Sequence, residues 1–221
     1  MSATTKQLSN PFSTGGGGVY FETRVQAAFV TLMLCGGVAP AMPPWPISKI
    51  KLQGKYAGFE TDDFIAFIAA PSGGPEYKPL AQIKHSLSIT ENNATFRDVI
   101  TSAWLDFNNT KIFQRQRDQI ALITGPLSAL DIEATRWVLE YARHSESSKD
   151  FFEKMKLGKF VSADKKNKLR AFQAQLNSAN GAEVPEEECW QFLKSFHLLG
   201  YDLDIQAGVT LSLLHSMVGQ F

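Results

Sequence analysis

Two short apolar runs constrain the fold of this chain more than any other feature. Residues 64–70 (FIAFIAA) and 120–123 (IALI) are almost continuously apolar, as strands are when both faces of a sheet are covered. Residues 47–54 alternate imperfectly between apolar and polar and predict a half-exposed strand. Residues 80–86 predict another strand after a loop rich in glycine and proline. Four strands of one sheet are therefore expected.

Helical patterns lie between and around these strands. An apolar stripe over residues 19–35 stops at Gly36-Gly37, and a second helical segment covers residues 94–108. The order helix, three strands, helix, strand predicts an α/β unit built on one sheet.

The chain divides into three parts by composition. Residues 1–18 are polar, end in GGGG and predict a flexible N-terminal segment. Residues 19–127 form the predicted core, and residues 128–221 a helical region whose first helix has Ser128 or Asp131 as its cap. Because an apolar helical pattern continues to the last residue, we expect a longer natural protein.

Composition excludes several classes of protein. The 221 residues carry 22 basic and 22 acidic side chains, so the chain has no net charge that would attract nucleic acid or a membrane. The two cysteines, Cys35 and Cys189, form no C-x-x-C pair, which argues against a disulfide framework. The apolar segment 27–42 is interrupted well short of the roughly 20 residues that span a membrane. We expect a cytoplasmic protein without membrane contact.

A lysine inside a predicted buried strand needs a partner or a chemical role. Gln82 and Lys84 are two residues apart and share one face of their strand, whereas His85 faces the other side. An isolated buried ammonium costs on the order of several kcal/mol. If the strands at 64–70 and 80–86 are neighbours, Asp63 lies beside Gln82 and Lys84, although an Asp62-Asp63 pair is also common in ordinary turns.

Glu22 supplies a further acidic group. It precedes Val25 by three residues and Phe29 by seven, so it lies on the apolar stripe of the first predicted helix. It could pair with an arginine or cap a backbone amide. Together with Asp63, Gln82 and Lys84, it also fits a shared metal site.

Asp63, followed by Gln82-Ile83-Lys84 on a later strand, resembles the D…(D/E/Q)-x-K signature of the PD-(D/E)xK nuclease superfamily, and Glu22 resembles the acidic residue that many members place on the first helix. The resemblance covers about residues 15–127. It implies a restriction-endonuclease-like α/β fold: a mixed central sheet flanked by helices, with an α-helical C-terminal half. GVYFE, ETDDFIAF and QIKHS are similar to the N-terminal nuclease domains of bacterial anti-phage proteins that continue into a STAND NTPase.

The resemblance also implies a site. Asp63, Gln82, Lys84 and Glu22 are the expected catalytic residues. The expected ligands of Mg²⁺ or Mn²⁺ are Asp63, Gln82, the Ile83 carbonyl and Glu22, and whether Asp62 or Asp63 is the acidic ligand stays open. Lys84 would orient or deprotonate a water that attacks a DNA phosphodiester. Because Gln82 is neutral where a carboxylate is usual, a degenerate module that only binds nucleic acid or mediates assembly is the alternative.

The expected partner is double-stranded DNA, cut with little sequence specificity, by a domain that becomes a homo-oligomer when an attached STAND NTPase activates it. A stand-alone restriction enzyme would need a recognition module, and none is recognisable. The basic residues expected to contact the DNA backbone are Lys154, Lys156, Lys159, Lys165, Lys166, Lys168, Arg170, Arg115 and Arg117.

Overall fold

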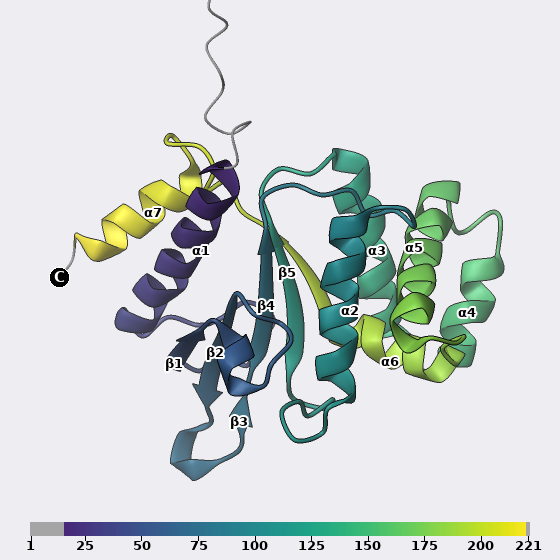
Figure 1. The fold of residues 1–221 in the computed structure, drawn as a ribbon, viewed down its shortest axis with the longest axis horizontal. Coiled ribbons are helices and arrows are strands. Elements are labelled where there is room, and N and C mark those ends of the chain that lie inside the picture. The colour runs from purple at the N-terminus through teal and green to yellow at the C-terminus, as the bar shows by residue number, and fades with distance from the viewer. Residues whose placement is uncertain (1–15, 220–221) are drawn as a thin grey trace, which may run out of the picture.

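A mixed sheet forms the centre of the computed structural model, which describes residues 16–219 (Figure 1). Within these residues the sheet has six strands in the order β1-β2-β4-β5-β6, with β3 paired to β2. Antiparallel pairing joins β1, β2 and β4, and parallel pairing joins β4, β5 and β6. The strands are β1 (Ile47–Leu52), β2 (Phe64–Ala69), β3 (Glu76–Tyr77), β4 (Pro79–Lys84), β5 (Gln119–Thr124) and β6 (Phe196–Gly200).

Helices cover both faces of the sheet (Figure 1). One face carries α1 (Gly16–Leu34) and α7 (Val209–Val218). The other carries α2 (Ala94–Asn108), α3 (Ala129–His144), α4 (Ser148–Lys156), α5 (Ala163–Asn180) and α6 (Glu186–Ser195). No helix among residues 16–219 has the length and apolarity that crossing a bilayer requires.

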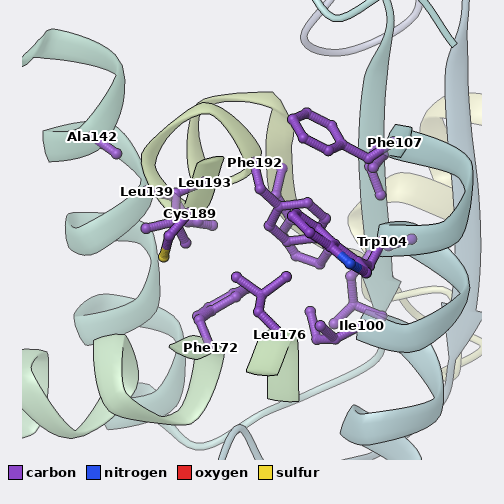
Figure 2. Packing of buried hydrophobic residues seen from close by; sticks show 14 of the residues in the cluster. Ile100, Trp104, Phe107, Leu139, Ala142, Phe172, Leu176, Cys189, Phe192 and Leu193 are labelled. Carbon is purple, nitrogen blue, oxygen red and sulfur yellow. The ribbon is translucent and has the colours of Figure 1, made fainter. Parts of the chain in front are cut away.

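The period-two alternation of strand side chains feeds two separate cores. Leu80 and Leu122 point into the larger core, and Ala81 and Ile123 into the smaller core under α1. Aromatic rings fill much of the larger core, in which Phe192 of α6 meets Trp104 and Phe107 of α2 edge to face, with ring centroids 5.8 and 5.4 Å apart. Figure 2 shows these rings between α2 and α6. Burial on both faces explains the apolar strand sequences.

One predicted helix is in part a strand. Within the expected helical region 128–221, α6 ends at Ser195, and residues 196–200 form β6 beside β5. Phe196 and Leu198 alternate into the larger core. The expectation of an all-helical C-terminal half is therefore wrong at this strand, which joins residues beyond 127 to the same sheet.

The first helix begins earlier than expected. Gly16, Gly17 and Gly18 belong to α1, although the GGGG run predicts a flexible segment up to residue 18. Phe21, Val25 and Phe29 bury one face of α1, and this packing outweighs the poor helix propensity of glycine. Residues 1–15 of the predicted segment lie outside the described residues.

Other boundaries follow the sequence pattern closely. Helix α2 covers the predicted residues 94–108, and Asn93 caps it by accepting from the Phe96 N–H at 2.8 Å. Ser128, and not Asp131, caps α3, since its hydroxyl accepts from the Asp131 N–H at 3.0 Å.

A buried carboxylate sets the register of the parallel pair β4 and β5. Asp118, which is fully buried just before β5, accepts from the Lys78 N–H at 3.0 Å and from the Gln114 N–H at 2.8 Å. Its Oδ2 also lies 3.1 Å from the Lys78 ammonium. Because Lys78 directly precedes β4, these bonds hold the starts of both strands together.

We expect Asp118→Ala to lower the free energy of unfolding by about 3–5 kcal/mol, because it removes the buried carboxylate that pairs with the Lys78 ammonium and accepts from two backbone N–H groups. Urea denaturation measures this. Glu153→Ala is the control, since Glu153 pairs with Lys149 at 3.9 Å on the exposed surface and should change stability by less than about 0.5 kcal/mol. An Asp118→Ala loss below about 1 kcal/mol would show that the clamp does not hold the strands.

Candidate functional site

The pairing of β2 with β4 ends after two positions, Phe64 with Ala81 and Ile65 with Leu80. Two residues after Ala81 on β4, the Ile83 N–H donates to the Asp63 carboxylate at Oδ2. A side chain thus replaces the backbone acceptor that a continuing ladder would supply. Because the N–H and C=O of one strand residue point to the same side, the Ile83 carbonyl also faces the side of Asp63.

Lys84 meets the same carboxylate. Its Nζ lies 3.5 Å from Asp63 Oδ2, and the two side chains are 31% and 15% exposed. The ammonium is thus paired, yet it keeps an opening to solvent and donors that Asp63 does not use. The lysine at the end of β4 has the partner that its position requires.

Gln82 lies on β4 between Leu80, which faces the larger core, and Lys84. The residue is 8% exposed, and its Oε1 is buried without a hydrogen-bond partner within the described part of the chain. A buried carbonyl oxygen without a donor is costly, and an ion or a water commonly explains one.

Helix α1 adds Glu22 and an amide that joins it to the strand. Gln26 Nε2 donates to Glu22 Oε1 at 3.1 Å and to the Asp63 backbone carbonyl at 3.2 Å. Burial raises the pKa of the Glu22 carboxyl, and the Asp63 carboxylate raises this pKa further. The Lys84 ammonium and the Gln26 amide oppose this rise. Glu22 therefore belongs to the same electrostatic group as Asp63 and Lys84.

The structure distinguishes the two adjacent aspartates. Asp62 Oδ1 accepts from the Lys55 N–H at 2.8 Å, and its carbonyl accepts from the Gly54 N–H at 2.7 Å. Asp62 thus holds the short 3₁₀ helix Gly54–Ala57, whereas Asp63 lies beside Lys84. Of the two, Asp63 is the aspartate whose carboxylate contacts Ile83 and Lys84 of β4.

A buried aspartate that the sequence analysis did not select holds the loop before β2. The Asp106 carboxylate, on α2, accepts from the Glu60 N–H at 2.8 Å and the Thr61 N–H at 2.7 Å. Desolvation raises its pKa, and these two bonds oppose the rise. The sequence signal for Asp106 was an acidic residue at a core position of a predicted helix. The signal for Gln26 was its spacing of four residues from Glu22, which places both on one face of the helix.

The basic residues predicted to contact DNA do not adjoin this site. The lysine-rich segment lies on α4, α5 and the loop between them, and Figure 1 places these helices on the side of the molecule away from α1. Lys168 is buried and binds the Asp131 carboxylate and the Ile89 carbonyl. Arg115 pairs with Glu188 at 2.8 Å.

The other predicted contacts differ in how free their charges are. Lys154 pairs with Asp150 at 2.8 Å, and Lys165 lies over the Trp137 ring at 4.0 Å. Lys166 donates to the Lys156 carbonyl at 3.1 Å. The side chains of Lys156, Lys159 and Arg170 are exposed, and Arg117 is half-buried.

The oxygens at this site suit a hard divalent cation. They comprise the carboxylates of Asp63 and Glu22, the unpartnered Gln82 amide oxygen and the Ile83 carbonyl, and Mg²⁺ and Mn²⁺ favour oxygen ligands. Residues 16–219 contain no group of three or more His, Cys, Asp or Glu side chains arranged to hold a metal. The candidate set depends instead on an amide and a backbone oxygen.

Comparison with known proteins does not assign this chain to a family. No family model, curated protein or solved structure matches it. Its function must therefore be argued from the site.

Glu22→Gln tests the electrostatics of the site without any ligand. A raised pKa in the folded state means that the contribution of Glu22 to stability is present below its ordinary pKa and is lost as the pH rises through the folded value. Glutamine has no such dependence. We therefore expect the stability of the variant, relative to the parent, to rise as the pH is raised from about 4 in urea denaturation. A difference that stays constant with pH would contradict the shared charge environment.

Proposed function

We propose that this chain is a metal-dependent DNA endonuclease domain that hydrolyses phosphodiester bonds with low sequence specificity. One observation carries the proposal: Asp63, directly before β2, and Lys84, at the end of β4, meet at 3.5 Å where the β2–β4 ladder ends. The unpartnered Gln82 oxygen lies on the same strand as Lys84, and the charges of Asp63 and Lys84 both act on the Glu22 carboxyl.

The order of elements supports a restriction-endonuclease-like fold for this domain. Helix α1 is followed by the antiparallel strands β1, β2 and β4, and α2 then connects β4 to the parallel strand β5. Two of these strands supply the Asp and the Gln-x-Lys of the resemblance, and α1 supplies Glu22. The proposed fold and the proposed site therefore rest on the same connectivity.

In this proposal Asp63, Gln82, the Ile83 carbonyl and Glu22 hold Mg²⁺ or Mn²⁺. A bound divalent cation lowers the pKa of a coordinated water and offsets charge on the phosphodiester. The protein's own part is to fix these oxygens on strand ends, because a site built on rigid elements loses less entropy when it orients its ligand.

Lys84 is the proposed catalytic cation. An ammonium has three donors and no acceptor, so after pairing with Asp63 it can still donate to a phosphate oxygen and to an attacking water. Fixed donors that face developing negative charge stabilise the transition state without reorganising. Asp63 keeps the flexible lysine stem turned toward the scissile group.

The biological setting is proposed from the resemblance alone. We propose that the domain acts in anti-phage defence, that oligomerisation activates it, and that an attached STAND NTPase controls this step. A resting state of low activity would protect the host's own DNA.

One observation favours a second candidate, a nuclease fold that only binds nucleic acid or mediates assembly. Gln82 contributes a neutral oxygen where a carboxylate would hold a divalent cation more firmly. A site weakened in this way could keep its architecture without turnover.

Lys84→Met tests the proposed catalytic residue while keeping an apolar stem. We expect cleavage of plasmid DNA in Mg²⁺ to fall by about 100-fold or more, because a donor to the transition state is lost. Lys111→Met, at an exposed position between α2 and β5, is the matched control and should cleave like the parent. A Lys84→Met protein as fast as the parent would remove Lys84 from the mechanism.

Gln82→Glu separates the two candidates. The added carboxylate should lower the Mn²⁺ concentration at half-maximal cleavage by about tenfold, since the charge of the ligands tunes cation affinity. A working nuclease already cleaves with Gln82 in place and only needs less Mn²⁺ after the change. If the parent cleaves at no Mn²⁺ concentration and yet binds DNA, the binding module is the better assignment.

A further inference from the structure

A buried hydroxyl at the end of β5 has no partner. Thr124 is 1% exposed, and its Oγ1 makes no hydrogen bond within residues 16–219. Its backbone carbonyl, by contrast, accepts from the Tyr201 N–H at 2.9 Å. A buried hydroxyl that gains no bond destabilises the fold, and a bond to a ligand or to its water would offset this cost.

The strand register places this hydroxyl beside the candidate site. In the parallel pair β4–β5, Thr124 is opposite Lys84, and Leu122 is opposite Gln82. Leu122 points into the larger core, so by alternation Thr124 lies on that same face of the sheet, together with Gln82 and Lys84. Two buried oxygens without donors, Gln82 Oε1 and Thr124 Oγ1, therefore lie on neighbouring strands and one face.

A close backbone approach fixes the end of β5 at this point. Gly125 follows Thr124, and a Cβ atom at Gly125 would lie only 2.7 Å from the His85 carbonyl oxygen. The chain after β5 thus passes directly against the residue that follows Lys84. The backbone of Thr124 is thus held beside the end of β4.

We propose that Thr124 is a further cation-binding residue, whose hydroxyl accepts a hydrogen bond from a water of the hydrated divalent cation. The inference rests on the proposed function, since it concerns the same cation. Mg²⁺ and Mn²⁺ bound by few protein ligands keep several waters, and each of these waters needs acceptors. Thr124 adds such an acceptor on β5, next to the strand on which Gln82 stands in place of a carboxylate.

Thr124→Val removes the hydroxyl and keeps the shape of the side chain. With the purified protein and Mn²⁺ alone, electron paramagnetic resonance of free Mn²⁺ measures the dissociation constant. We expect Thr124→Val to weaken Mn²⁺ binding about tenfold, a typical effect of a residue outside the direct ligands. Thr124→Ser, which keeps the hydroxyl, should bind within about twofold of the parent. The thermal unfolding midpoint of Thr124→Val should be unchanged or higher.

Thr135→Val is the matched control. Thr135, on α3, is also fully buried with an unpartnered hydroxyl, but we assign it no part in the site. The same chemical change there should leave Mn²⁺ binding as it is in the parent.

Asp63→Ala distinguishes failure of the inference from failure of the proposed function. If the parent binds Mn²⁺, Asp63→Ala does not, and Thr124→Val binds like the parent, only the role of Thr124 is overturned. If the parent and Asp63→Ala are alike in binding no Mn²⁺, both proposals fall. A Thr124→Val protein with a clearly lower unfolding midpoint would also overturn the inference, because the hydroxyl would then serve the fold.

Discussion

The early end of the β2–β4 ladder is the constraint on which the rest of the site depends. A backbone N–H in the interior of a sheet must find an acceptor, and at Ile83 that acceptor is the carboxylate of Asp63. This bond ties an acidic side chain to the strand that carries Gln82 and Lys84, so the geometry of the site is part of the hydrogen bonding of the sheet. Lys84 then pairs with the same carboxylate at 3.5 Å.

Polar contacts from three other elements hold this arrangement in place. Asp106 on α2 fixes the loop that leads to Asp63, and Gln26 on α1 joins Glu22 to the Asp63 backbone. Asp118 aligns the starts of β4 and β5. Three buried side-chain oxygens near the site make no hydrogen bond within residues 16–219: Thr61 Oγ1, and those of Gln82 and Thr124, which we assign to the proposed cation.

Much of the fold could be predicted because burial leaves a local pattern. The apolar runs that became β2 and β5, and the helical stripe of α2, are visible in the sequence. Strand β6 was missed because residues 196–199 continue a helical pattern without a glycine or proline to end it. Only the packing beside β5 makes them a strand, and such a tertiary effect has no local signature.

The site was predictable to the extent that its residues violate expected burial. Glu22 on an apolar stripe and Lys84 in a buried strand are visible conflicts, and the structure brings both near Asp63. Gln26 and Asp106 contact other elements, and strand pairing places Thr124 beside Lys84. Spacing along the chain reveals neither. Composition alone was misleading for one residue of the lysine-rich segment. The run of lysines indicated surface charges, but Lys168 is buried and pairs with Asp131.

The central claim is that Asp63, Gln82 and the Ile83 carbonyl surround one divalent cation. Anomalous diffraction from a crystal containing Mn²⁺ tests it directly. The account predicts a peak whose distances to an Asp63 carboxylate oxygen, Gln82 Oε1 and the Ile83 carbonyl oxygen are each roughly 2.0–2.6 Å. A peak at other residues, or Gln82 Oε1 bonded to a protein donor with no Mn²⁺ near Asp63, would contradict it.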